Sequence, residues 1–427
     1  MKFKIFNKYI LTTIYIIIYY YGYNTFLAAV FSYAGFEFHD KDLWVYLYTY
    51  ALMILPLLLY KEGKISSFIS TFVYILLYIP IIFSYTFIPL ELDLHIIGSQ
   101  LSFFIGMCMF FVARKIDYNL DIGRANILFS PKVIMVTAVF LSVVTLIVFR
   151  NNIKLVSFED VYDLREEANK ISEGNALLGY LNVWLTNFFM PVCMAYGIIQ
   201  KKKIYYLVGF FVALTLYLST GAKIAIIFPL VYFFFNNIFK GDKIKNFYVV
   251  LVASLSAVAL IVLVVFSIFP DNPTIFMITS ILFSRTLANG GMLTFWYDRF
   301  FQNHPFTNFS HINFINIITQ SYPYQKELGY IIGSEFWNEK MNANANFWAT
   351  DGVASHGILG ILIANILFFL ILVLFNTVSR NFNKLFIIFL FLPFISVFLN
   401  TSIFTSLLSG GAFLSIIFLI NLKKQKL

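Results

Sequence analysis

The sequence predicts an all-α polytopic integral membrane protein with about twelve transmembrane helices. Of its 427 residues, 60% are hydrophobic and only 12% are charged, whereas soluble domains average roughly 25% charged residues. Apolar stretches close to 20 residues long recur along the chain, and that is about the length that a helix needs to cross a bilayer. The Lys and Arg residues between these stretches also alternate in a way that is typical of membrane topology.

The spans begin almost at the N-terminus. The first runs from Tyr9 to Ser32 after a basic start. It is too long for the apolar core of a signal peptide, roughly 7–15 residues, and no small-residue cleavage site follows, so we expect it to be retained. The predicted spans are 9–32, 43–60, 66–84, 97–113, 133–149, 177–199, 204–219, 222–239, 247–269, 353–376, 385–400 and 402–420.

The charges between the spans predict the orientation of the chain. With the N-terminus in the cytoplasm, 20 of the 30 Lys and Arg residues fall inside, and 17 of the 21 acidic residues fall outside. The acidic residues left inside are Glu62, Asp117, Asp121 and Asp242. This is a strong positive-inside pattern, and it predicts that both termini are cytoplasmic. The net charge of +9 therefore reflects membrane topology, and no nucleic-acid partner is expected.

The hydrophilic parts of the chain indicate where it works. We expect a single integral membrane domain over residues 1–427, with two long outer loops at 150–176 and at 270–352, the second between spans 9 and 10. Every predicted cytoplasmic loop is short, so the function is expected at the outer face. The sequence has no phosphate-binding Gly-rich loop, which argues against ATP hydrolysis. Cys108 and Cys193 both lie in apolar stretches and offer neither a disulfide framework nor a metal site, and no cofactor is expected.

Arg165 is the most informative of the ten cations expected outside. If residues 158–173 form a helix, Arg165 projects from the apolar face of that helix. A cation at an apolar boundary needs an anion, either a ligand or a structural carboxylate, unless its side chain extends to water. The apolar face would carry Phe158, Val161, Tyr162, Leu164, Ala168 and Ile171. The opposite face would carry Glu159, Asp160, Asp163, Glu166, Glu167, Lys170 and Glu173.

Three more outer cations are candidate ligands for an anion. Lys223 lies where one span ends and the next begins, and an intramembrane cation is a functional hypothesis by default. Arg285 has no acidic residue close to it in sequence, whereas Arg299 follows Asp298 and could simply pair with it. Gly290 and Gly291 are expected to break the segment between these two arginines into two short helices.

Several cations at the outer face suggest a site for a membrane-bound polyanion, and a diphosphate fits this chemistry. Guanidinium groups bind phosphate oxygens in a bidentate geometry and stay charged at any working pH. They can also stabilise a diphosphate leaving group without a metal.

Three stretches carry a resemblance to a known family. They are FEDVYDLREEANK (158–170), YLSTGAKIAIIF (217–228) and SRTLANGGMLTFWYDRFFQNHP (284–305), the last leading to NANANFWATDGVASHGILG (342–360). Together they resemble bacterial oligosaccharide repeat-unit polymerases, the Wzy-type O-antigen and capsule polymerases. The resemblance covers about a third of the chain, and the other spans are generic.

The resemblance implies a GT-C-like fold in the bacterial inner membrane and a periplasmic active site. Such an enzyme is a metal-independent glycosyltransferase that polymerises undecaprenyl-diphosphate-linked oligosaccharide repeat units into O-antigen or capsule polysaccharide. The implied partners are that lipid-linked oligosaccharide, membrane lipids and a chain-length regulator protein. The residues expected to bind substrate or its diphosphate are Arg165, Lys223, Arg285, Arg299, Tyr297 and Asn346. Relatives often carry arginine where this chain has Lys223, which keeps the charge but loses the bidentate geometry.

The transfer reaction also needs a group that accepts the proton of the attacking sugar hydroxyl, and histidine is the usual choice. His356 is the best placed candidate because it lies at the mouth of a span. His304 and His311 are alternatives, and Asp351 could serve instead.

Three other functions fit parts of the sequence. A lipid-linked oligosaccharide flippase also has about twelve spans, but two similar halves and charges within the spans, both expected of such transporters, are not evident here. A metal-dependent GT-C enzyme would need an acidic pair such as Asp40 and Asp42 in the first outer loop. An O-antigen ligase would share the fold and the cationic site but would use a lipid A core acceptor.

Overall fold

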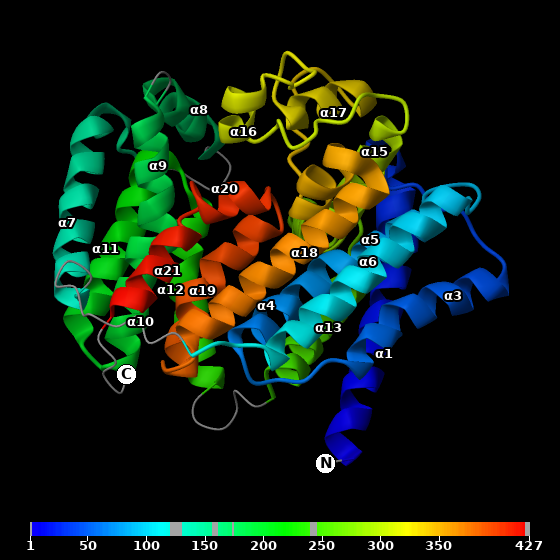
Figure 1. Ribbon diagram of the computed structural model, residues 1–427, viewed down its shortest axis with the longest axis horizontal. Coiled ribbons are helices and arrows are strands. Elements are labelled where there is room, and N and C mark those ends of the chain that lie inside the picture. The colour runs from blue at the N-terminus through cyan, green and yellow to red at the C-terminus, as the bar shows by residue number, and fades with distance from the viewer. Residues whose placement is uncertain (1, 120–129, 156–160, 173–174, 240–245, 423–427) are drawn as a thin grey trace. The chain divides into compact units, whose positions relative to one another are not determined.

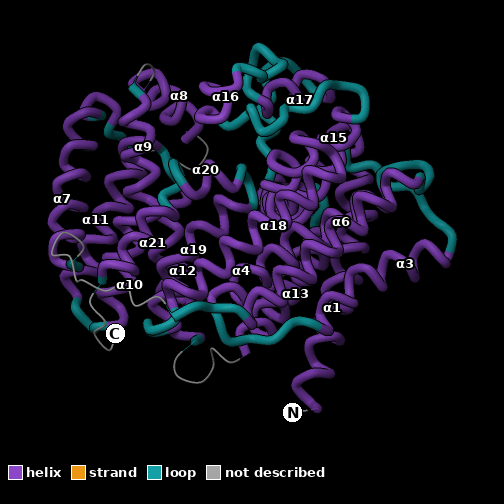
Figure 2. The backbone as a smooth tube through the Cα atoms, viewed as in Figure 1, coloured by secondary structure: helices purple, strands orange, loops and turns teal. Residues whose placement is uncertain are grey.

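The computed structural model describes residues 2–119, 130–155, 161–172, 175–239 and 246–422. Helices joined by loops and turns make up this part of the chain, which contains no strand (Figure 2). The prediction of an all-α chain is therefore confirmed for the described residues.

Eight of the described helices are long and apolar enough to cross a membrane. They are Asn7–Ala34, Ile65–Phe87, Leu94–Lys115, Pro131–Val148, Leu177–Ile199, Lys203–Thr220, Phe247–Ile268 and Trp348–Ser379. The remaining predicted segments coincide with shorter apolar helices, Leu43–Leu58, Lys223–Ile238, Lys384–Phe398 and Ala412–Asn421. The chain is thus rich in candidate membrane spans, whereas the number twelve stays a prediction.

The chain divides into two compact units. Unit 1 comprises Met1–Ile116, Asn246–Leu374 and Phe398–Ile403. Unit 2 comprises Asp117–Lys245, Phe375–Val397 and Phe404–Leu427. Each unit is described by itself below.

Unit 1 is built around one almost completely buried helical stretch. It consists of α4 (Ile65–Val73), the π-helical turn Tyr74–Tyr78 and α5 (Ile79–Phe87). The hydroxyls of Tyr74 and Tyr78 donate to the carbonyls of Met53 (2.6 Å) and Leu52 (2.7 Å) in α3 (Leu43–Ile54). These two buried phenols therefore have partners inside the bundle, as an apolar environment requires.

Helix α15 (Asn289–Phe301) packs directly on α5. A Cβ atom at Gly291 would lie 2.3 Å from the carbonyl oxygen of Pro80, so only glycine allows this approach. The helical backbone runs without a gap from α14 (Pro273–Ser280) through the π-helical segment Ile281–Ala288 into α15. The prediction that Gly290 and Gly291 break this segment is wrong, because here the glycines permit close packing.

The segment 270–352, expected as a large loop, contains further helices. After α15 come α16 (Asn313–Thr319) and α17 (Leu328–Phe336), which lie at the end of unit 1 away from its N-terminus (Figure 1). The π-helical turn Trp348–Val353 then leads into α18 (Ala354–Ser379). Helix α18 is interrupted near its start, where His356 (φ −156°, ψ 30°) and Gly357 (φ 57°, ψ −132°) leave the helical conformation.

Unit 2 contains α7 (Pro131–Val148), α10 (Met190–Ile199) and α11 (Lys203–Thr220), which pack on one another. Helix α12 (Lys223–Ile238) follows α11 after a two-residue turn. The predicted span 402–420 is interrupted: α20 (Ile403–Leu407) and α21 (Ala412–Asn421) are separated by a turn in which Gly411 adopts a positive φ of 87°. A single straight span over 402–420 is therefore not present.

Candidate functional site

In unit 2, Arg165 and Lys223 meet at one backbone carbonyl. Helix α11 ends at Gly221, whose φ of 63° reverses the chain before Lys223 begins α12. The Gly221 carbonyl oxygen accepts the Nε–H of Arg165 at 3.0 Å and the backbone N–H of Lys223 at 2.9 Å. We call Arg165, Gly221 and Lys223 the cationic turn. Two of the candidate ligands for an anion, 58 positions apart in sequence, thus belong to the same small structure.

Helix α8 (Val161–Ser172) presents Arg165 to this turn. Leu164 and Ala168 are buried, Arg165 is half-buried, and Glu166 and Glu167 are exposed. These positions agree with the orientation expected from helical periodicity. Ile171 departs from it because its side chain is 37% exposed. Phe158, Glu159, Asp160 and Glu173 lie outside the described residues, as do the side chains of Val161, Tyr162 and Asp163.

A buried amide fastens α8 to the end of α11. Asn152 is 2% exposed, and its Nδ2 donates to the carbonyls of Leu164 (3.3 Å) and Ser219 (3.0 Å). On the opposite face of α8, Glu166 pairs with Lys170 at 2.8 Å and Glu167 pairs with Lys154 at 3.0 Å. The hydrogen bond from Lys170 lowers the pKa of Glu166. Glu166 and Glu167 are therefore each paired with a lysine, and Arg165 contacts the turn instead.

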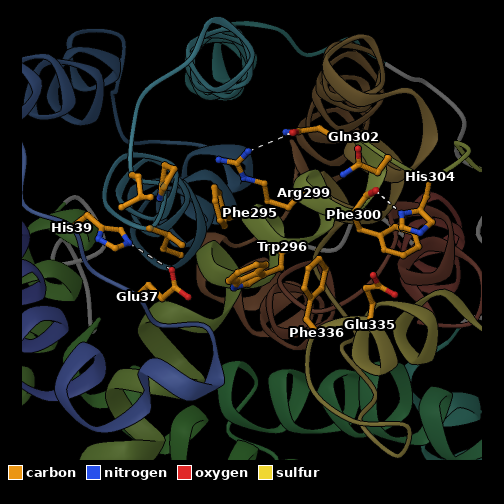
Figure 3. A pocket seen from close by; sticks show the side chains of 14 residues that line it. Glu37, His39, Phe295, Trp296, Arg299, Phe300, Gln302, His304, Glu335 and Phe336 are labelled. Carbon is orange, nitrogen blue, oxygen red and sulfur yellow. Dashed lines mark hydrogen bonds and ion pairs between the residues drawn. The ribbon is translucent and has the colours of Figure 1, made fainter.

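Unit 1 contains an open pocket of 520 Å³ at the end that carries α15 and α17 (Figure 3). Two of the predicted site residues, Arg299 and His304, lie in its wall. The lining combines aromatic rings with carboxylates, imidazoles, amides and one guanidinium. The lining residues are Glu37, His39, Ile88, Pro89, Leu90, Phe295, Trp296, Arg299, Phe300, Gln302, Asn303, His304, Glu335 and Phe336.

Arg299 is held in this wall without help from Asp298. Its guanidinium lies 5.1 Å from the centre of the Phe295 ring, and Nη1 is 3.4 Å from Oε1 of Gln302. Asp298 is 2% exposed and pairs instead with His95, whose Nε2 lies 3.0 Å from both carboxylate oxygens. The expected pairing of Arg299 with its sequence neighbour is therefore not what the structure shows, and Arg299 faces the pocket (Figure 3).

His304 is oriented in a way that defines its tautomer. Its ring stacks on Phe300 with 3.8 Å between centroids and 2° between planes, and Nδ1 lies 2.9 Å from the Phe300 carbonyl oxygen. A carbonyl can only accept, so Nδ1 carries the hydrogen. In a neutral ring, Nε2 then holds the lone pair and can accept a proton. Of the histidines considered from sequence, His304 is the one in the pocket wall.

Asp351 lies at the centre of a separate, buried network. Its side chain is completely buried, and Oδ1 accepts from Ser402 (2.6 Å) while Oδ2 accepts from the backbone N–H of Ile403 (2.6 Å). The third partner is His311, whose Nε2 is 3.2 Å from Oδ1 and whose Nδ1 is 3.0 Å from Oγ1 of Thr307. With no exposed surface, Asp351 holds its neighbours in place, and a catalytic role for it stays a prediction.

His356 lies close to the same network but outside the pocket. Its ring stacks with Phe306 (6.4 Å between centroids), and the loop bearing Phe306 is fixed by hydrogen bonds from Thr307 N and Oγ1 to the Ala354 carbonyl. The Nδ1 atom of His356 is buried and has no hydrogen-bond partner in the described part of the chain. His356 lies at the break in α18 and is not among the pocket residues.

Tyr297 and Asn346, both expected to bind substrate, have internal roles. Each is 0% exposed. The Tyr297 hydroxyl donates to the Ala343 carbonyl (3.0 Å), and Asn346 donates to Gly290 O and Thr294 Oγ1 while accepting from the backbone N–H of Trp348. These bonds use the polar atoms of both side chains, so the structure assigns them to the packing of α15 against the start of α18. Their expected role in substrate binding stays a prediction.

Arg285 is exposed on the π-helical segment Ile281–Ala288 and is not part of the pocket wall. The neighbouring Phe283 is buried, which fixes this segment against the first helix at Gly22. The environment of Arg285 thus differs from that of Arg299, although both arginines belong to unit 1.

Sequence reasoning missed several residues that the structure brings to these sites. Glu37, His39, Glu335 and Phe336 come from segments about 300 positions apart, and nothing local marks them as neighbours. His95 could have been found, since a titratable side chain at the start of an apolar span is a functional hypothesis by default. Among the described residues, no group of three His, Cys, Asp or Glu side chains is arranged to hold a metal ion.

Comparison of the chain with protein-family models, with curated protein sequences and with solved structures gives no match.

Proposed function

We propose that this protein is a membrane glycosyltransferase that polymerises undecaprenyl-diphosphate-linked oligosaccharide repeat units into O-antigen or capsule polysaccharide. The proposal places it in the bacterial inner membrane, with both termini cytoplasmic and the reaction at the periplasmic face. The observation that carries it is the cationic turn, in which Arg165 and Lys223 share the Gly221 carbonyl. The sequence resemblance to repeat-unit polymerases supports the same conclusion.

The cationic turn suits a lipid-linked diphosphate. Because Nε of Arg165 is used by Gly221, the two terminal amino groups provide the bidentate edge that matches two phosphate oxygens. Lys223 adds a second positive charge. Its attraction to the diphosphate becomes stronger as the leaving group gains negative charge in the transition state. Arg285 is assigned to the same class of ligand.

His304 is the proposed proton acceptor. A hydroxyl of the acceptor sugar attacks the anomeric carbon of the donor glycan, and the bond from that carbon to the diphosphate oxygen breaks. The diphosphate leaves with the bonding electrons, and the hydroxyl gives its proton to a general base, the role for which Nε2 of His304 is the candidate. Its fixed tautomer supports this role, since Nδ1–H is already committed to the Phe300 carbonyl.

The test is a polysaccharide gel on a strain that lacks the gene, complemented with wild type, Arg165→Ala, Arg165→Lys or Lys154→Ala. Arg165→Ala is expected to reduce the ladder to one repeat unit, and Arg165→Lys to restore part of it. Lys154→Ala is the matched control, because Lys154 is a cation of the same loop that only pairs with Glu167 on the exposed side. Membrane levels of each variant are compared by immunoblot.

Other outcomes would reassign the function. Loss of all repeats with a build-up of lipid-linked units in the cytoplasmic leaflet would indicate a flippase. Free polymer that is not attached to lipid A core would indicate a ligase. A full ladder from Arg165→Ala would remove the cationic turn from the site.

A further inference from the structure

We propose that the pocket of unit 1 binds an uncharged pyranose of the acceptor glycan and rejects acidic sugars such as uronic acids. This inference rests on the proposed function and names the kind of sugar that the same enzyme extends. It follows from three properties of the pocket: an aromatic platform, a set of polar groups and an excess of negative charge.

The platform is formed by Trp296 and Phe336. The Trp296 indole is partly exposed, and its N–H donates to the Gly35 carbonyl at 3.1 Å, which fixes the plane of the ring. Phe336 lies against it with 4.8 Å between ring centroids. A rigid aromatic face of this kind matches the apolar C–H face of a pyranose and costs little conformational entropy on binding.

Polar groups surround the platform. In Figure 3, Glu37 and His39 lie on one side of Trp296 and Glu335 lies toward the other, near His304. The exposed Gln302 completes the set with an amide. Carboxylates accept hydrogen bonds from sugar hydroxyls, and an amide both donates and accepts. A volume of 520 Å³ is within the range of small-ligand sites, roughly 300–1,000 Å³.

The charge of the wall selects against anions. Glu37 and Glu335 are both exposed, and the wall carries these two carboxylates and one guanidinium when His39 and His304 are neutral. Nε2 of His39 lies 3.6 Å from Oε2 of Glu37. That guanidinium, on Arg299, already lies over the Phe295 ring and close to Gln302. A carboxylate on the ligand would therefore meet like charges, and specificity is often built from such a repulsive contact. The same excess makes the pocket a poor site for a diphosphate.

The test uses the purified full chain in detergent and saturation-transfer difference NMR with three methyl glycosides: N-acetylglucosaminide, glucoside and glucuronide. The two neutral glycosides are expected to bind, with saturation strongest on the protons of one sugar face. The glucuronide is expected to bind at least about tenfold more weakly, the size of effect that a like-charge contact produces near a protein surface. Equal or tighter binding of the glucuronide would overturn the proposal.

Two variants locate the effect. Trp296→Ala is expected to abolish binding of all three glycosides, and Trp296→Phe to retain it. Glu37→Gln combined with Glu335→Gln is expected to bring the glucuronide to within about threefold of the neutral sugars. Binding of the neutral glycosides by the double variant shows that the pocket is still folded. Unchanged discrimination in a folded double variant, or normal binding by Trp296→Ala, would reject the proposal.

The outcome is separable from that of the polymerase test. If Arg165→Ala keeps a full ladder while the pocket still discriminates, the sugar site stands and the diphosphate assignment fails. If the ladder responds as expected but the pocket binds the glucuronide equally well, the polymerase stands and the sugar preference is rejected.

Discussion

The cationic turn of unit 2 and the pocket of unit 1 each present an arginine, but the neighbours of the two arginines differ. Arg165 contacts a backbone carbonyl two residues before a lysine, and Glu166 and Glu167 of its helix are paired with lysines on the other face. Arg299 shares its pocket with two glutamates and lies on an aromatic ring. The comparison teaches that an arginine identified from sequence alone does not reveal the charge of its ligand. The charge of the ligand depends on the carboxylates that surround the arginine.

His304 and His311, which both follow α15, also differ in the groups that surround them. His304 lines the pocket and keeps Nε2 available, whereas both nitrogens of His311 are bonded to Asp351 and Thr307. His311 is accordingly a positioning residue, and His304 is the one able to exchange a proton with a ligand. The predictions below separate the pocket, its buried support and the cationic turn.

The largest effect is expected from His304→Asn. The asparagine amide can still donate to the Phe300 carbonyl, but it lacks the atom that accepts the proton. Loss of a general base lowers the rate by about 10²–10⁴-fold. The measurement is polymer formation from lipid-linked repeat units in membranes, with His39→Asn as the matched pocket variant, expected to lose much less. Near-normal polymerisation by His304→Asn would show that another residue is the base, and His356 would be the next candidate.

Asp351→Asn tests the buried support of the pocket segment. An amide nitrogen in place of Oδ2 would face the backbone N–H of Ile403, and the pair with His311 would lose its charge. Breaking a buried pair of this kind costs about 3 kcal/mol. Thermal unfolding of the purified protein should show a lowered Tm, with a smaller decrease for Ser402→Ala. An unchanged Tm with abolished polymerisation would instead make Asp351 a catalytic residue.

Gly221→Ala perturbs the cationic turn alone. An alanine at a φ of 63° costs about 1 kcal/mol and moves the carbonyl that Arg165 and Lys223 share. Polymerisation should fall while sugar binding by the pocket is retained. Gly179→Ala, in α9 (Ala176–Trp184) of the same unit, is the control, because no other atom lies within 4 Å of the added Cβ position. Equal losses in the two variants would count against the turn.

The smallest effect is expected from Tyr297→Phe, which distinguishes packing from binding in α15. The variant loses the hydrogen bond to the Ala343 carbonyl, which contributes about 1 kcal/mol of stability. Tm should fall slightly, and the ladder should keep its length. Trp296→Ala, one position earlier and in the pocket wall, should shorten the ladder. A shortened ladder from Tyr297→Phe at normal Tm would return this residue to the substrate site.

The sequence predicted those features that depend on local periodicity. Apolar stretches located the candidate spans, and the helical period placed Leu164 and Ala168 inward and Glu166 and Glu167 outward. The same reasoning failed where a distant partner decides the structure. Gly291 looked like a break because glycine disfavours helices, but the Pro80 carbonyl packed against it favours glycine at that point of α15.

The candidate sites were predictable only in part for the same reason. Asp298 pairs with a histidine 203 positions away, and Asp351 with a serine 51 positions away, so neither partner could be chosen from spacing. Tyr297 and Asn346 stood in promising motifs, and the sequence did not show that both side chains are buried. Periodicity gives the direction in which a side chain points along its own helix, but not what it meets there.

The indole bond from Trp296 to Gly35 also has a consequence for biogenesis. It joins a segment that leaves the ribosome early to one that is made roughly 260 residues later, and Phe336 is made later still. The sugar pocket therefore cannot exist on any nascent chain that ends before about residue 336. Until then Glu37 and His39 lie on a short loop, and the rest of the pocket wall has not been synthesised. The early helices can therefore be in place long before the pocket is complete.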